Sequence, residues 1–383
     1  MNRFEDICKR LHFKCKRLHS GVAFAVFCDK NNNIGMVNEK MGKTRTAPTL
    51  NDVAQEAGVS TATVSRCLNF PDRVVPKTRE RVMQAVEKLG YTPNFAARVM
   101  AANRSFTIGA IIPTMDNAIF ARGLQAFQDE LRDHGYTLLV SSSAYKPEVE
   151  REQIRTLVAR GADGLLLIGH ERDEQIYEYL DRHQIPALVA WSFLPDARQP
   201  SVGFNNRKAM CELAQRVIEA GHRRIAMISG FTDGNDRALN RVQGVRDALQ
   251  AHGIELEALT LIETSYEIEK GAKAFQDLMS LDPRPTAVMC GNDVLAVGAL
   301  REAQRLGISI PDQVSVTGFD DIELAEIVSP SLTTVHVPHR EMGRKAAREL
   351  IAMVEGTSDG NSTCIRTHVV TRCSLAKAQK NSN

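Results

Sequence analysis

Polar and aromatic residues follow several apolar runs between residues 106 and 320, where they could hold a small molecule. Aromatic rings can stack on a ligand, and Arg, Asn and Asp groups make directed hydrogen bonds, a combination that suits a polyhydroxylated sugar or its acid. The candidates at these positions are Phe120, Arg122, Lys146, Arg237, Arg241, Tyr266, Asn292 and Asp320. Asp293 is interpreted as a helix cap, because a lone Asp after a strand commonly caps the next helix.

Catalytic motifs are missing from the sequence. It contains no G-x-G-x-x-G opening a helix after a strand, no G-x-x-x-x-G-K-[ST], no G-x-S-x-G and no H-E-x-x-H. The stretch GFTDGND at residues 230–236 lacks the dinucleotide-binding spacing. We therefore expect a binding protein rather than an enzyme, with no catalytic residues, no cofactor and no metal.

Residues 49–69 predict two short helices joined by a tight turn. Thr49 and Asp52 form a capping pair, and the apolar residues after them recur at i, i+3, i+4 and i+7, which is one helix face. Gly58 ends the first helix and Ser60 caps the second. The second helix presents a small polar face with one long basic arm, which suits the major groove of DNA. This face consists of Thr61, Ala62, Ser65, Arg66 and Asn69.

A third helix over residues 76–89 distinguishes this unit from an ordinary helical hairpin. Pro76 fits a first helical turn, and apolar residues of helical spacing complete a three-helix core. Within such a head Arg66 is the expected base reader, because its guanidinium can bind guanine through two hydrogen bonds. Thr61 and Ala62 would discriminate between neighbouring bases through methyl contacts. Phosphate contacts are expected from Ser60, Ser65, Thr78 and Asn94.

Charge is segregated along the chain. Residues 1–40 hold 8 Lys and Arg against 4 Asp and Glu, and residues 41–104 hold 10 against 5, whereas the remaining 279 residues have a net charge of −7. A basic head on an acidic body is expected if only the head meets phosphate. The eight cysteines show no paired CxxC spacing, which indicates reduced, cytosolic thiols. No apolar run reaches the roughly 20 residues of a membrane helix.

The first 40 residues fit none of the patterns seen in the rest of the chain, and three interpretations are open. A secretory signal would need a longer apolar core than GVAFAVFC, and export would leave a DNA-binding head outside the cell. A metal site is conceivable, although its spacing matches no zinc pattern, from Cys8, His12, Cys15 and His19. We favour a disordered extension or a mis-assigned start, with Met41 opening the natural chain.

From residue 106 onward, short apolar runs alternate with stretches of helical spacing that end in Gly. This repetition predicts βαβ units and parallel sheets. About 270 residues are more than a single α/β sheet usually contains, so two α/β lobes are expected. A ligand is expected between the lobes, at the strand ends.

The runs TLNDVAQEAGVSTATVSRCLN and VPKTRERVMQAVEKLGYTPN, followed by AARVMA, resemble the head of the lactose-repressor and galactose-repressor family of bacterial transcription regulators. The resemblance extends to about residue 376. It implies a helix-turn-helix head, a hinge helix and a two-lobed α/β effector domain like a periplasmic binding protein, assembled as a homodimer on pseudo-palindromic operator DNA. In the hinge, Met100 stands at the position that wedges open the minor groove and Ala97 at the close-packing position.

By the same resemblance, the small ligand of the family is held at the positions of Phe120, Arg241, Tyr266, Asn292 and Asp320. The phrases YKPE at 145–148 and VGFNN at 202–206 are similar to gluconate-responsive members, which adds Asn205, where those relatives tend to have Asp. A cleft containing Arg237, Arg241 and Lys146 favours an anionic effector such as a sugar acid.

The predicted protein is therefore a cytoplasmic, homodimeric repressor of carbohydrate catabolism genes whose operator affinity is controlled by a sugar or sugar acid. A purine or another small metabolite is the alternative effector, and a sugar-binding or transport protein is the alternative class. The expected divisions are an extension at 1–46, a DNA-binding domain at 47–92, a hinge at 93–104, and an effector domain at 105–383, with an N-lobe of 105–204 and 334–357 and a C-lobe of 205–333 and 358–376.

Overall fold

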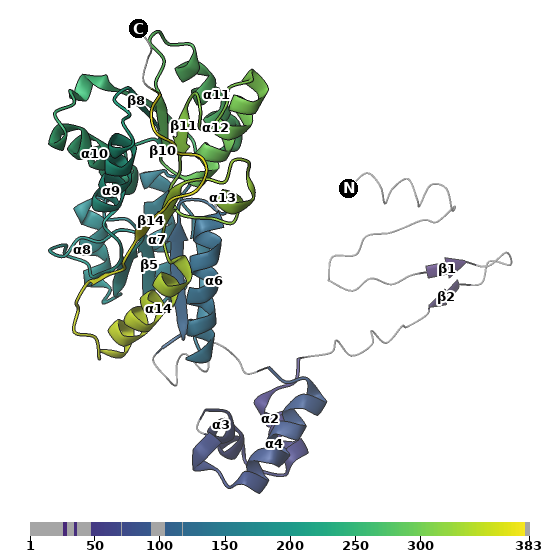
Figure 1. Ribbon diagram of the computed structural model, residues 1–383. Coiled ribbons are helices and arrows are strands. Elements are labelled where there is room, and N and C mark those ends of the chain that lie inside the picture. The colour runs from purple at the N-terminus through teal and green to yellow at the C-terminus, as the bar shows by residue number, and fades with distance from the viewer. Residues whose placement is uncertain are drawn as a thin grey trace. The chain divides into compact units, whose positions relative to one another are not determined.

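The computed structural model describes residues 26–28, 34–36, 47–69, 71–92, 104–116 and 118–379 (Figure 1). The chain divides into two compact units, Met1–Asn94 and Phe95–Asn383. In the first unit, strands β1 (Val26–Cys28) and β2 (Ile34–Met36) pair antiparallel. The rest of the predicted extension, residues 1–46, lies outside the described residues, as does the predicted hinge up to residue 103.

The head of the first unit is built from α2 (Leu50–Ala57), α3 (Thr61–Asn69), the 3-10 turn η1 (Pro71–Arg73) and α4 (Pro76–Leu89). The predicted capping box of α2 is confirmed. The Thr49 hydroxyl accepts the Asp52 amide at 3.3 Å, and the Asp52 carboxylate accepts the Thr49 amide at 2.7 Å. Gly58 ends α2 at φ 62°, a left-handed conformation that favours glycine.

Each helix of the head contributes to one small apolar core. Val53, Val64 and Val82, from α2, α3 and α4 respectively, are each fully buried. Val59, in the turn after Gly58, packs against the same cluster. This core fixes the angle between α2 and α3, and it leaves the opposite face of α3 exposed.

The second unit begins with the N-lobe, a six-stranded parallel sheet in the order β13-β7-β6-β5-β3-β4. Its strands are β3 (Thr107–Ile112), β4 (Thr137–Ser142), β5 (Gly164–Ile168), β6 (Ala187–Ala190), β7 (Ser201–Gly203) and β13 (Thr363–Cys364). Successive residues of β3 point to opposite faces, so Ile112 joins the core under α6 (Ala118–Asp133) and α14 (His339–Glu355). Ile111 joins the core under α7 (Pro147–Ala159) and α8 (Glu174–Arg182).

The C-lobe repeats this plan with a four-stranded parallel sheet in the order β11-β10-β8-β9. Its strands are β8 (Ile225–Gly230), β9 (Leu259–Thr264), β10 (Ala287–Cys290) and β11 (Ser315–Thr317). One face packs on α9 (Asn206–Glu219) and α10 (Asp236–Ala251), and the other on α11 (Ile268–Met279) and α12 (Asp293–Leu306). Shorter elements complete the lobe, η2 (Leu256–Ala258) and α13 (Leu324–Ile327).

The chain passes between the lobes after β7 and again along two antiparallel strands, β12 (Thr334–His336) and β14 (His368–Val370). The expected lobe boundary at residue 358 is wrong. Strand β13 pairs with β7, and the Ile365 amide donates to the Gly203 carbonyl at 2.6 Å. Residues 363–365 therefore complete the N-lobe sheet before the chain returns to the C-lobe. The expected fold class, a helix-turn-helix region followed by two parallel α/β lobes, is confirmed.

Candidate functional site

The predicted DNA-reading face lies on α3 in the head. Thr61, Ala62 and Arg66 are exposed and Ser65 is half-buried, whereas Val64 on the opposite side of the helix is buried in the head core. One helix thus anchors itself with its apolar side and presents small polar groups with a single long cation to solvent. This arrangement can place base-contacting side chains in a major groove.

The flanking candidates lie around this helix. The Ser60 hydroxyl accepts the Thr63 amide at 3.2 Å, which confirms Ser60 as a cap of α3. Thr78 is half-buried near the start of α4, and Asn69 is the last residue of α3. The three predicted hinge contacts lie outside the described residues: Asn94, Ala97 and Met100.

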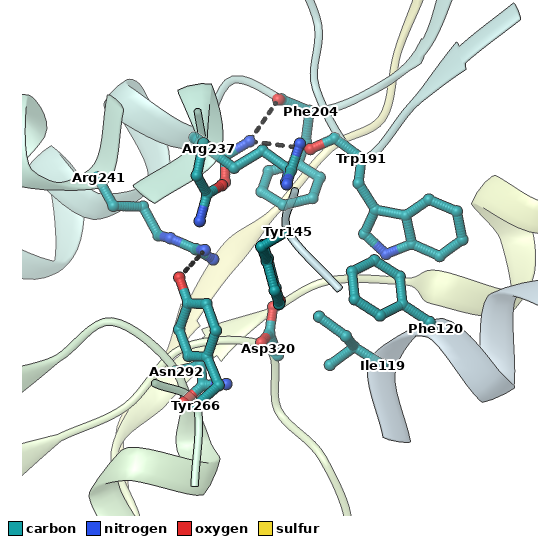
Figure 2. A pocket seen from close by; sticks show the side chains of 12 residues that line it. Ile119, Phe120, Tyr145, Trp191, Phe204, Arg237, Arg241, Tyr266, Asn292 and Asp320 are labelled. Carbon is teal, nitrogen blue, oxygen red and sulfur yellow. Dashed lines mark hydrogen bonds between the residues drawn. The ribbon is translucent and has the colours of Figure 1, made fainter. Parts of the chain in front are cut away.

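In the second unit, a pocket lies between the carboxyl ends of the two sheets (Figure 2). The N-lobe lines it with Ile119, Phe120, Tyr145, Trp191 and Phe204, and the C-lobe with Asn206, Asn235, Arg237, Arg241, Tyr266, Asn292 and Asp320. Six of the nine residues predicted from the sequence meet here. A pocket at the strand ends of both lobes is the position expected for a ligand in this architecture.

Arg241, on α10, brings a guanidinium group to the pocket wall. Its guanidinium carbon lies 4.9 Å from the centre of the Phe319 ring, and its Nη2 donates to the Tyr266 hydroxyl at 3.2 Å. The side chain is 6% exposed, and its Nε has no hydrogen-bond partner in the described part of the chain. A buried donor without a partner is available to a ligand acceptor.

Asp320, after β11, supplies an acceptor to the same pocket. Burial raises the pKa of its carboxyl to about 7, and the nearby Arg241 opposes this rise. Its Oδ2 is buried and has no partner among the described residues. Asn206, which also lines the pocket, has a buried Oδ1 without a partner among the described residues. The pocket thus contains one unsatisfied donor and two unsatisfied acceptors, which could bind a hydroxyl-rich ligand together.

Aromatic rings form much of the remaining wall. Phe120 and Trp191 pack edge to face with centroids 5.5 Å apart, and Tyr145 lies against Tyr266 at 6.0 Å. In Figure 2, Phe120 and Trp191 stand on the side of the pocket opposite Arg241. Burial raises the pKa of Tyr145, so its phenol stays protonated and can donate a hydrogen bond.

Three of the pocket residues have a backbone conformation that side-chain-bearing residues rarely adopt. The φ angles are 58° at Tyr145, 60° at Trp191 and 107° at Asp320. Such conformations cost free energy and collect at functional sites, where they aim a side chain that a relaxed backbone would direct elsewhere. Here they direct two aromatic rings and one carboxyl toward the same cavity.

Sequence reasoning missed half of the lining, namely Ile119, Tyr145, Trp191, Phe204, Asn206 and Asn235. A signal existed for two of them, because Tyr145 and Trp191 follow apolar runs that became β4 and β6. The two Asn residues carry no such signal. The Asn206 amide donates to the Trp191 carbonyl at 3.0 Å, and that of Asn235 to the Phe231 carbonyl at 3.2 Å.

The structure places three predicted effector residues outside this pocket. Arg122 forms an ion pair of 2.5 Å with Glu323. Lys146 lines a neighbouring cavity, to which Tyr145 also contributes. Asn205 caps α9, where its side chain accepts the Lys208 amide at 2.9 Å, and the adjacent Asn206 enters the pocket instead. A shift of one residue at the start of a helix turns the side chain to another face.

The expected helix cap at Asp293 is also wrong. The cap of α12 is Asn292, whose side chain accepts the Leu295 amide at 3.0 Å. Asp293 is buried and accepts the Thr334 hydroxyl at 2.6 Å and the Ile322 amide at 2.9 Å. Burial raises the pKa of Asp293 well above its usual range. It therefore ties the loop after β11 to crossover strand β12.

Comparison with known proteins agrees with this architecture. The model of bacterial regulatory proteins of the lacI family matches residues 49–94, and a periplasmic binding protein-like domain matches residues 214–375. The HTH-type transcriptional repressor CytR of Escherichia coli (strain K12) is 35% identical over 326 residues, which are 85% of this chain and 95% of the repressor.

Two solved structures extend the likeness. The lac repressor dimer bound to operator and the anti-inducer ONPF is 25% identical, with a TM-score of 0.77 over 86% of this chain and 100% of that one. The complex of the transcriptional regulator CelR with cellobiose is 30% identical, with a TM-score of 0.63 over 85% and 99%.

The chain belongs to the LacI family of bacterial regulatory proteins. It is a DNA-binding transcriptional repressor with an effector-binding domain, and the relatives it matches are repressors rather than enzymes. None of the described helices is long and apolar enough to cross a bilayer. Within the described ranges, His, Cys, Asp and Glu side chains form no group that could hold a metal ion.

Proposed function

We propose that this repressor is a cytoplasmic homodimer that controls carbohydrate catabolism genes in response to a sugar bound in the interlobe pocket. The observation that carries the proposal is the facing pair of Arg241 and Asp320, each with a free buried polar atom, between aromatic walls. A sugar ring offers an apolar face to aromatic side chains and hydroxyls that both donate and accept. The related CelR structure contains cellobiose, which is a neutral sugar.

The pocket supports a neutral sugar better than the sugar acid that the sequence favoured. That expectation rested on three cations, Arg237, Arg241 and Lys146. Lys146 lies in the neighbouring cavity, and the Arg237 guanidinium is engaged by Asp236 at 3.0 Å. Arg241 alone of the three remains for a ligand, and the Asp320 carboxyl, with a pKa of about 7, offsets its charge in part near neutral pH.

On the DNA side, two heads would occupy successive major grooves of a pseudo-palindromic operator, with Arg66 reading a guanine in each half-site. The hinge at 93–104, with Met100 as its wedge and Ala97 beside it, would order on the operator. Effector binding would shift the relative positions of the lobes and so change the affinity for DNA.

The test is a thermal-shift screen of sugars, sugar acids and purines, followed by gel shifts on an operator selected from random DNA. We expect a neutral sugar to stabilise the protein and to change operator affinity. Arg241→Ala should abolish that response while leaving operator binding intact. The matched control is Arg301→Ala, which breaks an exposed ion pair with Glu269 in the same lobe and should respond normally. An unchanged effector response in Arg241→Ala contradicts the proposed site.

A purine base or nucleoside is the second candidate effector. Five aromatic side chains line the pocket, and a flat heterocycle could stack on one of these rings. A stabilising hit from adenosine or hypoxanthine, with no hit from any sugar, would favour this candidate over the first.

A further inference from the structure

Asp236 and Arg237, at the start of α10 in the C-lobe, reach across the cleft to the N-lobe. The Arg237 Nη1 donates to the Ile168 carbonyl at the end of β5, at 3.0 Å. The Asp236 Oδ2 accepts the His170 amide and the Ser192 hydroxyl, each at 2.9 Å. Nη1 of Arg237 also lies 3.0 Å from the Asp236 Oδ1, so the two side chains form one unit that joins both lobes.

The N-lobe leaves room for this pair at Gly169. A Cβ on Gly169 would lie 1.9 Å from the Arg237 Nη1 and 2.2 Å from the Asp236 Oδ1. Gly169 also has φ 76°, which favours glycine independently. The charged side chains of Asp236 and Arg237 approach the backbone of Gly169 so closely that no other residue would fit there. This indicates a specific contact between the lobes.

The pair is buried, so its charges act strongly on the pocket. Arg237 is 8% exposed and lines both the effector pocket and the neighbouring cavity. Burial opposes ionisation of Asp236, but Arg237 and the donors from His170 and Ser192 hold its pKa below the usual range. Asp236 therefore stays ionised and cancels the charge of the neighbouring guanidinium. Glu171 lines the neighbouring cavity, and burial raises the pKa of its carboxyl.

We propose that Asp236 is a specificity-determining residue of the effector site, because it holds the Arg237 guanidinium across the cleft and cancels its charge, so that the pocket takes a neutral ligand. This inference rests on the proposed function in that it concerns the same pocket. Removing the carboxylate charge leaves a buried cation at the pocket wall, and an anionic group on the ligand then becomes its counter-ion.

The selectivity test uses matched neutral and anionic probes: glucitol with gluconate, glucose with glucuronate, and adenosine with adenosine 5′-monophosphate. We expect wild-type protein to prefer the neutral member of whichever pair it binds. Asp236→Asn should shift that ratio about tenfold or more toward the anion, because the uncancelled cation attracts it. Asp236→Asn with Arg237→Met should restore the neutral preference. A wild-type preference for the acid, or an unchanged ratio in Asp236→Asn, overturns the proposal.

A second readout needs no ligand, because the chain has a single tryptophan, Trp191, which is 2% exposed, lines the pocket and precedes Ser192. Acrylamide should quench its fluorescence more readily in Asp236→Asn and Arg237→Met than in wild type, since the lobes lose their shared contact. Asp247→Asn, which breaks an exposed ion pair with Arg207, is the matched control and should match wild type.

The two readouts separate the inference from the proposed function. Equal quenching in all variants overturns the role of Asp236 whatever the ligand is. Enhanced quenching in Asp236→Asn and Arg237→Met, combined with no Arg241-dependent binding of any probe, supports the contact across the cleft and contradicts the proposed effector class instead.

Discussion

Asp320 is a residue whose ionisation is opposed by the fold itself. It is 2% exposed, and burial raises the pKa of its carboxyl from 3.8 to about 7 despite Arg241 nearby. At pH values between about 4 and 7, Asp320 is protonated to a greater extent in the folded protein than in the unfolded chain. Its contribution to the free energy of unfolding therefore falls as pH rises. Buried groups with strongly shifted pKa values cluster at functional sites, which supports the ligand-binding role proposed for Asp320.

We therefore expect Asp320→Asn to flatten the dependence of stability on pH between about 4 and 7. The Asn side chain keeps the shape of the group but does not titrate, so its contribution to the slope disappears. Urea denaturation of both proteins at several pH values measures this. Equal slopes for wild type and variant would show that Asp320 does not titrate in this range.

Arg66 is the residue on which the reading of DNA sequence depends most, because its neighbours on α3 are short. Arg66→Ala should cost about 1 to 3 kcal/mol of binding free energy at the operator and leave nonspecific DNA nearly unaffected. Arg81→Ala, which removes an exposed cation from α4, is the control. Fluorescence anisotropy titrations with operator and with nonspecific DNA measure both affinities. Equal losses of affinity for the two DNAs in Arg66→Ala would refute base reading.

At the scale of elements, the ends of helices determine how the head presents its reading face. α2 ends at Gly58 and α4 at Gly90, with φ of 62° and 63°. A Cβ at either glycine would meet nothing within 4 Å, so substitution costs only backbone strain. The two positions differ in their role, because Gly58 sets the angle at which the reading helix α3 begins, whereas Gly90 ends the last helix of the head.

Gly58→Ala and Gly90→Ala should therefore destabilise the protein similarly, by about 1 kcal/mol each, as expected for forcing a left-handed conformation on alanine. Operator affinity should fall more for Gly58→Ala, because α3 is reoriented. Thermal unfolding followed by circular dichroism and operator titration measure the two effects. Equal losses of operator affinity would mean that stability alone, and not the α2–α3 angle, limits binding.

The crossover segments are the elements that link the two lobes. β12 pairs with β14, and Asp293 fastens β12 to the loop that carries Asp320. The loop that carries Asp320 is therefore hydrogen-bonded, through Asp293, to a strand that connects the lobes. The pocket and the connection between the lobes are thus in direct contact.

For the whole molecule, charge separates the two binding functions. The first 104 residues have a net charge of +9 and the rest −7, while the Asp236–Arg237 ion pair at the effector pocket is buried. Phosphate contacts release counter-ions and are weakened by salt, whereas buried compensated charges are screened far less. The two binding equilibria should therefore respond differently to ionic strength.

We expect operator affinity to fall on the order of 10³-fold between about 50 and about 200 mM salt, as for a protein with several phosphate contacts. Effector affinity should change less than about twofold over the same range, because the pocket charges are shielded from the ions. Anisotropy titrations and thermal-shift titrations give the two constants. A parallel fall in effector affinity would indicate an exposed, uncompensated charge in the pocket.

Much of this protein could be predicted from its sequence because the deciding signals are local. Helical spacing, the Thr49–Asp52 capping box and Gly58 define the head within some twenty residues. Alternating apolar runs and helical stretches predict parallel α/β lobes, and aromatic and polar residues that follow those runs lie in the pocket, Phe120 and Asp320 among them. These features depend on hydrophobic period and backbone conformation, which neighbouring residues set.

Only the tertiary structure decided which polar groups are free for a ligand. Arg237 looks like a ligand cation in the sequence, but Asp236 and the backbone of the other lobe engage it. Asn205 and Asn206 differ by one helical step, and only the second faces the cavity. The return of residues 363–365 to the N-lobe sheet is likewise a long-range pairing. The contact of Arg237 with Ile168 and the pairing of β13 with β7 join segments far apart in the chain, and local sequence patterns do not contain them.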